Sequence, residues 1–293
     1  MMSDTSELAR RFRSPDLAAR FVSAYDAALA RWPREVTSAH VAGEHGTTRV
    51  QVCGPPDGTP LVLLHGGGCT STVWFANIAT LSRTHRVYAV DQLGDAGLSV
   101  PAGPPIRSPG DFMKWLAGLL DELGLEAAAF CGHSYGAWLA LSYALHSPAR
   151  VTRLVLLDPT SCFGGMGLRY RLHAVPLLAR PSAERTRRFL EWEAGGVPLE
   201  PLSLTVACLG GEFRGSKIVM PRRPKPADLR AASVPTLLLL AERSKAHDIR
   251  RIGGRAARLM PHLTAVVLPG ASHHSLPAAS PDRLNQELAD FLA

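Results

Sequence analysis

The chain has 293 residues, of which 46% are hydrophobic, with a formal net charge of +7 and a mean hydropathy of +0.04. This size and composition suit one soluble globular α/β domain with an insertion, and no apolar run approaches the ~20 residues of a membrane span, so no membrane association is expected. The arginines are spread along the chain without a base-stacking aromatic stripe, so we expect solvated surfaces and no nucleic-acid binding.

Cysteine usage and the N-terminal residues indicate a cytoplasmic protein. The basic run at residues 10–13 is not followed by the apolar core of an export signal. The cysteines are odd in number and lack metal-ligand spacing, which favours reduced thiols. They are Cys53, Cys69, Cys131, Cys162 and Cys208.

Residues 1–35 are expected to form an N-terminal helical extension. Ser14, Pro15 and Asp16 are typical of a helix start, and apolar side chains recur at positions 17, 21, 25 and 29. We expect this apolar face to pack on the body of the domain. Further along, residues 48–53 alternate in the manner of an edge strand, and the Gly-Pro-Pro-Asp-Gly sequence that follows predicts a turn.

Strands and helices then alternate along the chain. Because the predicted strands are continuously apolar rather than alternating, they should be buried on both faces, which indicates a mainly parallel sheet flanked by helices. Ligands bind at the carboxyl ends of such strands. The predicted strands are residues 61–64, 86–90, 127–131, 154–157, 236–240 and 264–268.

The segment 160–233 interrupts this alternation. It contains helical stretches and paired glycines but no clear strand–helix unit, and its aromatic and aliphatic residues argue against a disordered linker. We interpret it as a lid inserted over the site. The core of the domain would then consist of residues 1–159 and 234–293.

The sequence Gly-His-Ser-Tyr-Gly at 132–136 lies between a predicted buried strand and a predicted helix. A serine between two glycines on such a turn is typical of a nucleophile elbow. Glycines are needed because the turn is strained and a Cβ on either neighbour would collide with adjacent chain. The hydroxyl of Ser134 is thereby exposed at a helix N-terminus, which favours developing negative charge.

Two further loops follow predicted strands. The sequence His-Gly-Gly-Gly at 65–68 lets the backbone approach a substrate closely, as an oxyanion hole requires. A phosphate-binding loop is disfavoured because the P-loop and Rossmann spacings are missing. After the last predicted strand comes His273, so a histidine follows the elbow serine in the chain order that this template predicts.

These motifs resemble the α/β-hydrolase fold family over nearly the whole chain. The chain is most similar to the lidded, cofactor-independent esterases of that family, some of which are called carboxylesterases. The resemblance rests on His-Gly-Gly at 65–67 followed by Trp74, Asp-Gln-Leu-Gly-Asp at 91–95, the elbow at 132–136, Leu-Asp-Pro at 157–159 and Gly-Ala-Ser-His at 270–273.

This resemblance implies a role for each matching residue. Ser134 would be the nucleophile and His273 the general base. The N–H groups of Gly67 and Tyr135 would form the oxyanion hole. His274 is the second choice for the base, because the family pattern ends at His273.

The acid of the triad is where the sequence departs from the family. The family usually places Asp or Glu about four residues after the strand at 236–240, and this chain has Ser244 there. An acid is wanted to fix the histidine tautomer and to stabilise the imidazolium. Asp158, Asp248 and Glu242 are the alternatives. We favour Asp158 slightly, since some family members use the residue after the preceding strand, and we place Glu242 third.

The haloalkane dehalogenases and epoxide hydrolases of this fold have Asp at the elbow position. Ser134 therefore excludes these two enzyme classes. We expect a serine hydrolase that cleaves a small-molecule carboxylic ester through an acyl-enzyme. The alternatives are a noncatalytic or degraded hydrolase-fold binder, suggested by Ser244, and a cofactor-free C–C hydrolase or perhydrolase. The expected mechanism needs no cofactor, and the histidines at 65, 133, 273 and 274 lack the helical spacing of a metal site.

Overall fold

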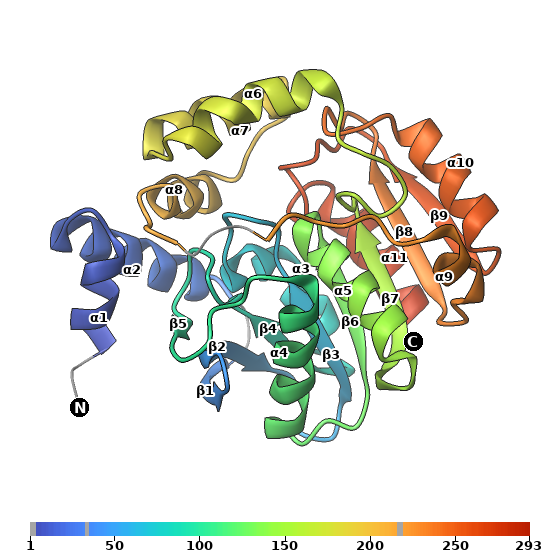
Figure 1. Ribbon diagram of the computed structural model, residues 1–293, viewed down its shortest axis with the longest axis horizontal. Coiled ribbons are helices and arrows are strands. Elements are labelled where there is room, and N and C mark those ends of the chain that lie inside the picture. The colour runs from blue at the N-terminus through green and yellow to red at the C-terminus, as the bar shows by residue number, and fades with distance from the viewer. Residues whose placement is uncertain (1–3, 33–34, 216–218) are drawn as a thin grey trace.

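The computed structural model describes residues 4–32, 35–215 and 219–293, which are organised around a mixed β-sheet (Figure 1). In this part of the chain the sheet has nine strands in the order β1-β2-β4-β3-β6-β7-β8-β9, and the short β5 pairs with β2. Neighbouring strands are parallel from β4 to β9, whereas β2 is antiparallel to β1 and β4. The strands are β1 (Thr37–Gly43), β2 (Gly46–Cys53), β3 (Thr59–Leu64), β4 (His85–Val90), β5 (Val100–Pro101), β6 (Ala128–His133), β7 (Val151–Leu157), β8 (Thr236–Ala241) and β9 (Leu263–Leu268).

Each continuously apolar run predicted as a strand is a strand in the structure, so the mainly parallel sheet is confirmed. The prediction that residues 48–53 form an edge strand is wrong, because they belong to β2, which lies between β1 and β4. The edge is formed by β1, which the sequence does not reveal because it contains few apolar residues. Its ladder with β2 holds it in place, with Val41 opposite Thr48.

Helices cover both faces of the sheet, because alternate residues of a strand point to opposite sides. In β3, Val62 and Leu64 pack with α4, α5 and α10, whereas Leu61 and Leu63 pack with α3 and α11. Burial on both faces is the reason for the continuously apolar strands. The helices of the core are η1 (Ser71–Trp74), α3 (Phe75–Leu81), α4 (Pro109–Glu122), α5 (Tyr135–His146), η2 (Pro148–Arg150), α10 (Ile249–Leu259) and α11 (Pro281–Leu292).

The N-terminal part of the chain forms α1 (Asp4–Arg11) and α2 (Pro15–Leu29). Helix α2 begins at the expected signal, since Ser14 Oγ accepts a hydrogen bond of 3.2 Å from Leu17 N–H. Its apolar face packs mainly on α8 (Pro201–Gly210), with Phe21 fully buried. Residues 1–3 and 33–34 of the expected helical extension lie outside the described residues.

Between β7 and β8 the chain forms α6 (Leu168–Ala179), α7 (Ala183–Ala194), α8 and α9 (Pro226–Ala231). Figure 1 shows α6 and α7 together at the top of the view, above α8. Tyr170 of α6 and Phe189 of α7 pack with Ala246, which follows β8. These two helices therefore lie at the carboxyl ends of the strands, where the candidate site residues gather.

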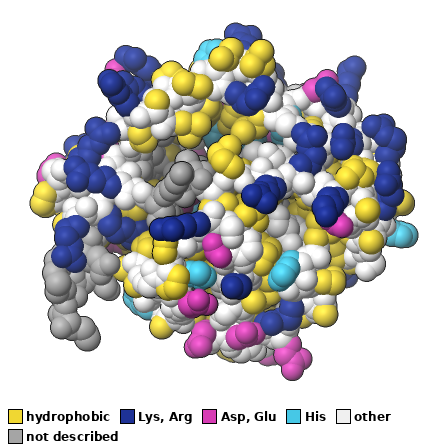
Figure 2. All heavy atoms as spheres, viewed as in Figure 1, with side chains coloured by type: hydrophobic (Ala, Val, Ile, Leu, Met, Phe, Trp, Pro, Cys, Tyr) yellow, Lys and Arg dark blue, Asp and Glu magenta, His cyan; other side chains and the backbone are white. Residues whose placement is uncertain are grey.

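Helix α6 exposes both apolar and basic side chains. Its large apolar side chains that are 54% to 64% accessible are Leu168, Leu172, Val175 and Leu178, and Arg169 and Arg171 are exposed beside them. Lys and Arg side chains are scattered over the visible face of the molecule rather than gathered in one stripe (Figure 2). None of the helices within the described ranges combines the length and the apolar composition that a bilayer span requires.

Candidate active site

Ser134 lies on the sharp turn between β6 and α5. Its backbone has φ 53° and ψ −111°, a conformation that residues with a Cβ rarely adopt. Close packing requires both flanking glycines: a Cβ on Gly132 would lie 2.4 Å from Gly136 O, and a Cβ on Gly136 would lie 2.2 Å from Leu64 O. The turn holds Ser134 at the N-terminus of α5, where the helix dipole favours negative charge.

The side chain of His273 lies directly beside Ser134. His273 Nε2 is 2.8 Å from Ser134 Oγ, and both side chains are buried. His273 is on the loop after β9, and His133 Nε2–H donates a hydrogen bond of 2.9 Å to its backbone carbonyl. The structure therefore brings together the serine and the histidine that the sequence singled out.

Asp158, the residue after β7, extends this pair into a chain of hydrogen bonds. Its Oδ2 accepts a hydrogen bond of 2.6 Å from His273 Nδ1–H. The carboxylate is fully buried and also accepts hydrogen bonds from Ala241 N–H at 3.2 Å, Ser244 Oγ–H at 2.7 Å and His247 Nε2–H at 3.0 Å. Several hydrogen-bond donors to one carboxylate stabilise its ionised form even when it is buried.

The other two acids considered from the sequence have different partners. Asp248 is the N-cap of α10, and its Oδ1 accepts hydrogen bonds from the N–H groups of Arg250 at 3.0 Å and Arg251 at 3.1 Å. Glu242 Oε2 accepts a hydrogen bond of 2.8 Å from Gly270 N–H. Of the three alternatives, the geometry favours Asp158.

Asp158 and His273 shift each other's pKa in the direction that favours the charged form of each. Burial raises the pKa of Asp158, but the charges and hydrogen bonds of His247 and His273 outweigh burial and hold this pKa well below its usual range. Burial lowers the pKa of His273, yet the hydrogen bond and charge of Asp158, together with the charge of Glu193, raise it above the ordinary value. His273 is therefore a stronger base than an exposed imidazole.

Thr160 makes a second contact with Ser134. Its Oγ1 is buried and lies 2.9 Å from Ser134 Oγ. Neutral His273 carries its proton on Nδ1, toward Asp158, so its Nε2 accepts from Ser134 Oγ–H. The Thr160 hydroxyl must then donate to Ser134 Oγ. Thr160 cannot be recognised as a site residue from the sequence alone, because a threonine near a strand end belongs to no motif.

His274, the second choice for the base, has a different partner. Its Nε2 and the hydroxyl of Tyr170 share a hydrogen bond of 3.0 Å. Burial, and then the charge of His273, hold the pKa of His274 well below its usual range. Burial likewise lowers the pKa of His133 to about 3. Both rings are therefore neutral near pH 7.

Gly67 and Tyr135, the residues expected to form the oxyanion hole, are close to one another. A Cβ on Gly67 would lie 3.7 Å from Tyr135 Cβ. Tyr135 is the first residue of α5, and N–H groups in the first turn of a helix have no acceptor inside it. The neighbouring Gly68 N–H donates to both carboxylate oxygens of Asp95, at 2.9 and 3.1 Å. Asp95 thereby anchors the glycine loop beside the elbow.

Two other polar residues of the site were not anticipated. His247 belongs to no motif and is recognised only by its contact with Asp158. Glu193 of α7 is fully buried and accepts hydrogen bonds from the backbone of the loop that carries His273. Its sequence signal is weak: it follows the apolar Phe189 by four residues, and positions four apart share a helix face.

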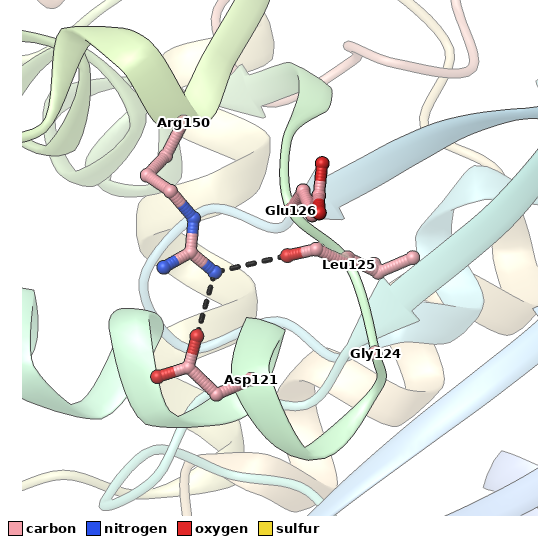
Figure 3. Close-up of a pocket in the computed structure, with 5 residues that line it drawn as sticks. All are labelled: Asp121, Gly124, Leu125, Glu126 and Arg150. Carbon is pink, nitrogen blue, oxygen red and sulfur yellow. Dashed lines mark hydrogen bonds and ion pairs between the residues drawn. The ribbon is translucent and has the colours of Figure 1, made fainter.

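The described residues contain no group of three or more His, Cys, Asp or Glu side chains placed to hold a metal ion. A hollow of about 450 Å³ contains the ion pair of Arg150 and Asp121, 2.8 Å apart. Figure 3 shows the two side chains pointing toward one another. The other residues that line the hollow, Gly124, Leu125 and Glu126, come just before β6. The hollow therefore lies at the amino ends of the strands, opposite Ser134.

Comparison with known proteins identifies the family of the chain. Residues 61–287 match the model of the family described as "Alpha/beta hydrolase family". The chain is 31% identical to carboxylesterase YbfK of Bacillus subtilis over 294 residues, which cover 96% of each chain.

Solved structures extend the likeness to three dimensions. The crystal structure of YbfK (CesB) matches with a TM-score of 0.89 over 95% of this chain and 99% of that one. The naproxen esterase of Bacillus subtilis, 30% identical, matches with a TM-score of 0.88 over the same shares of the two chains. The predicted α/β-hydrolase fold is thereby confirmed, and the chain belongs to the alpha/beta hydrolase family as an enzyme of the carboxylesterase type.

Proposed function

We propose that this enzyme hydrolyses carboxylic esters of small molecules, with Ser134 as nucleophile, His273 as general base and Asp158 as the acid of the triad. The observation that carries the proposal is the unbroken chain of hydrogen bonds from Ser134 Oγ through both ring nitrogens of His273 to Asp158, at 2.8 and 2.6 Å. The similarity to Bacillus subtilis carboxylesterases over nearly the full chain supports an ester as substrate.

In the first half of the reaction, Ser134 Oγ attacks the carbonyl carbon of the ester while His273 Nε2 takes the hydroxyl proton. The negative charge that develops on the carbonyl oxygen is stabilised by the N–H groups of Gly67 and Tyr135. Asp158 stabilises the imidazolium. His273 then gives its proton to the departing alkoxide oxygen, which leaves as the alcohol, and the acyl group remains on Ser134.

In the second half, a water molecule takes the place of the alcohol. His273 removes a proton from this water as its oxygen attacks the acyl carbon. The second tetrahedral intermediate collapses, the bond to Ser134 Oγ breaks, and Oγ regains its proton from His273. The products are one alcohol and one carboxylic acid for each ester and water consumed.

We further propose that segment 160–233 acts as a lid that walls the substrate pocket. Several contacts with the site support this role. Thr160 bonds to Ser134, and the ring of Tyr170 lies 6.0 Å from that of His273, centroid to centroid. The hydroxyl of Tyr135 donates a hydrogen bond of 2.8 Å to Val219 O. Such a wall limits which ester groups reach Ser134.

The direct test of the catalytic role is covalent labelling by a fluorophosphonate together with hydrolysis of a p-nitrophenyl ester. Ser134→Ala should abolish labelling, and His273→Ala should slow both reactions by orders of magnitude. Ser142→Ala, on the same helix as the elbow, is the matched control and should behave as wild type. Equal labelling of wild type and Ser134→Ala would favour the noncatalytic binder. So would wild-type protein that reacts with the fluorophosphonate but hydrolyses no ester.

The lid has its own test. Tyr170→Ala should change KM for bulky esters much more than KM for p-nitrophenyl acetate, because it removes a buried side chain beside the base. Leu172→Ala removes an exposed side chain from the same helix and should leave both values unchanged. Identical effects on large and small esters would show that α6 does not line the pocket.

A further inference from the structure

Glu193 lies on α7, outside the strand–helix core, and its carboxylate reaches into the core beside His273. The side chain is fully buried. Its Oε1 accepts hydrogen bonds from Lys245 N–H at 3.1 Å and His273 N–H at 3.2 Å, and its Oε2 accepts one from His274 N–H at 3.0 Å. One carboxylate thus joins α7 to the loops that follow β8 and β9.

A buried carboxylate is costly unless hydrogen bonds compensate for lost hydration. Here the partners are backbone N–H groups, which carry only partial positive charge, so the negative charge of Glu193 is not cancelled by a cation at these contacts. An anion held in a low-dielectric interior acts strongly on neighbouring charges. The nearest group whose charge changes during the proposed reaction is the imidazole of His273.

We propose that Glu193 is a positioning residue for the general base: it fixes the His273 loop through the backbone, and its charge stabilises the imidazolium formed on His273 during turnover. The inference rests on the proposed role of His273. In this arrangement the base has a carboxylate on each side, Asp158 bound to its ring and Glu193 bound to its backbone.

The other ionisable groups facing His273 do not supply this charge. The rings of His133, His247 and His274 lie 5.2, 6.3 and 4.8 Å from the His273 ring, and Tyr170 lies 6.0 Å away. The pKa values of His133 and His274 are lowered by burial, and that of Tyr170 is raised by burial, so these groups are neutral near pH 7.

Two further neighbours, His247 and Lys245, complete the surroundings. His247 shares Asp158 with His273, bound to the other carboxylate oxygen. Lys245 directs its ammonium group away, over the ring of Trp192 at 5.0 Å and toward the Trp192 carbonyl. The anions acting on His273 are therefore Asp158 and Glu193. Burial lowers the pKa of His273, and the charges of both carboxylates work against burial and raise it.

The test compares variants that separate charge from shape. Glu193→Gln keeps the size of the side chain and removes the charge. Glu193→Asp keeps the charge and shortens the reach. Glu191→Gln is the control, since Glu191 is on the same helix, is exposed and pairs only with Arg187 among the described residues. The second-order rate constant of fluorophosphonate labelling is measured from pH 5 to 9. Each value is normalised to the number of sites that are labelled at saturation.

In Glu193→Gln, loss of the charge lowers the pKa of His273, so the acidic limb of the rate profile should move to lower pH. The plateau should fall by about 10-fold or more, because the amide nitrogen cannot accept from His274 N–H and a buried donor is left unpaired. Glu193→Asp should keep the acidic limb close to that of wild type, and Glu191→Gln should match wild type throughout.

An acidic limb that stays in place in Glu193→Gln, with a lower plateau or lower Tm, would show that Glu193 only anchors the fold. Failure of both Gln and Asp variants to fold would also overturn the proposal, because a carboxylate one methylene shorter still carries the charge. These outcomes differ from failure of the proposed function, which Ser134→Ala reveals by retaining wild-type labelling.

Discussion

Ser244 Oγ–H donates a hydrogen bond of 2.7 Å to Asp158 Oδ2, the oxygen that also accepts from His273 Nδ1–H. Ser244 stands where this family usually has the acid of the triad. Here it donates a hydrogen bond to Asp158, which follows the preceding strand, β7. Strands β7 and β8 are parallel neighbours, with Leu157 opposite Leu239, so the residues that follow them reach the same place. Positions 158 and 244 are therefore close together in space, although they are far apart in sequence.

The first prediction concerns the identity of the acid. Asp158→Asn should lower kcat by on the order of 10⁴-fold, the loss known for the best-studied serine protease, because the asparagine no longer stabilises the imidazolium. Asp248→Asn should retain near-normal kcat, since Asp248 caps α10. Glu242→Gln should do so too. The measurement is kcat on one p-nitrophenyl ester, and collapse in Asp248→Asn with normal turnover in Asp158→Asn would reassign the role.

The second prediction uses the shared location of residues 158 and 244. Ser244→Asp alone should lower kcat, because two carboxylates in one buried site cannot both remain ionised without a large cost. In the Asp158→Asn background the same substitution should recover part of the lost kcat, since one carboxylate is again available near His273. Ser244→Ala in that background is the control. No recovery beyond this control would mean that position 244 cannot reach the imidazole.

Features set by local sequence could be predicted, whereas those set by distant contacts could not. The strands follow from apolar runs, and the turn at Ser134 follows from glycines whose replacement would place a Cβ against the backbone. Glu193 contacts His273 across 80 residues of sequence, and only its spacing of four residues from Phe189 distinguishes it locally from Glu191. From the sequence alone Asp158 is only slightly preferred to Asp248, because the sequence does not determine how far a loop folds back.

The edge strand β1 illustrates the same limit. Its residues are mostly exposed or half-buried, so its sequence lacks the apolar pattern that identifies a strand. It forms because β2 offers a free edge, which only the assembled sheet reveals. The polar contacts of Thr160 and His247 are likewise consequences of tertiary packing.

The third prediction concerns pH. His273 must be neutral to accept the Ser134 proton, so kcat/KM should fall as pH decreases through the pKa of His273. Because this pKa is raised above the ordinary 6.5, the midpoint of the acidic limb should lie above pH 6.5. The profile is measured from pH 5 to 9 at constant ionic strength, with spontaneous ester hydrolysis subtracted. A flat profile would contradict the assignment of His273 as base, whereas a midpoint below 6.5 would show that burial outweighs Asp158 and Glu193 in setting the pKa of His273.

The fourth prediction concerns Thr160, whose hydroxyl donates to Ser134 Oγ while Ser134 donates to His273. Thr160→Val keeps the shape of the side chain and removes this donor. Because a hydrogen bond of this kind contributes about 1 kcal/mol, the rate of fluorophosphonate labelling should fall about fivefold. Thr160→Ser restores the hydroxyl and should stay within about twofold of wild type on the same scale. Equal losses in the two variants would show that local packing around residue 160 sets the rate, and that the hydroxyl does not orient the nucleophile.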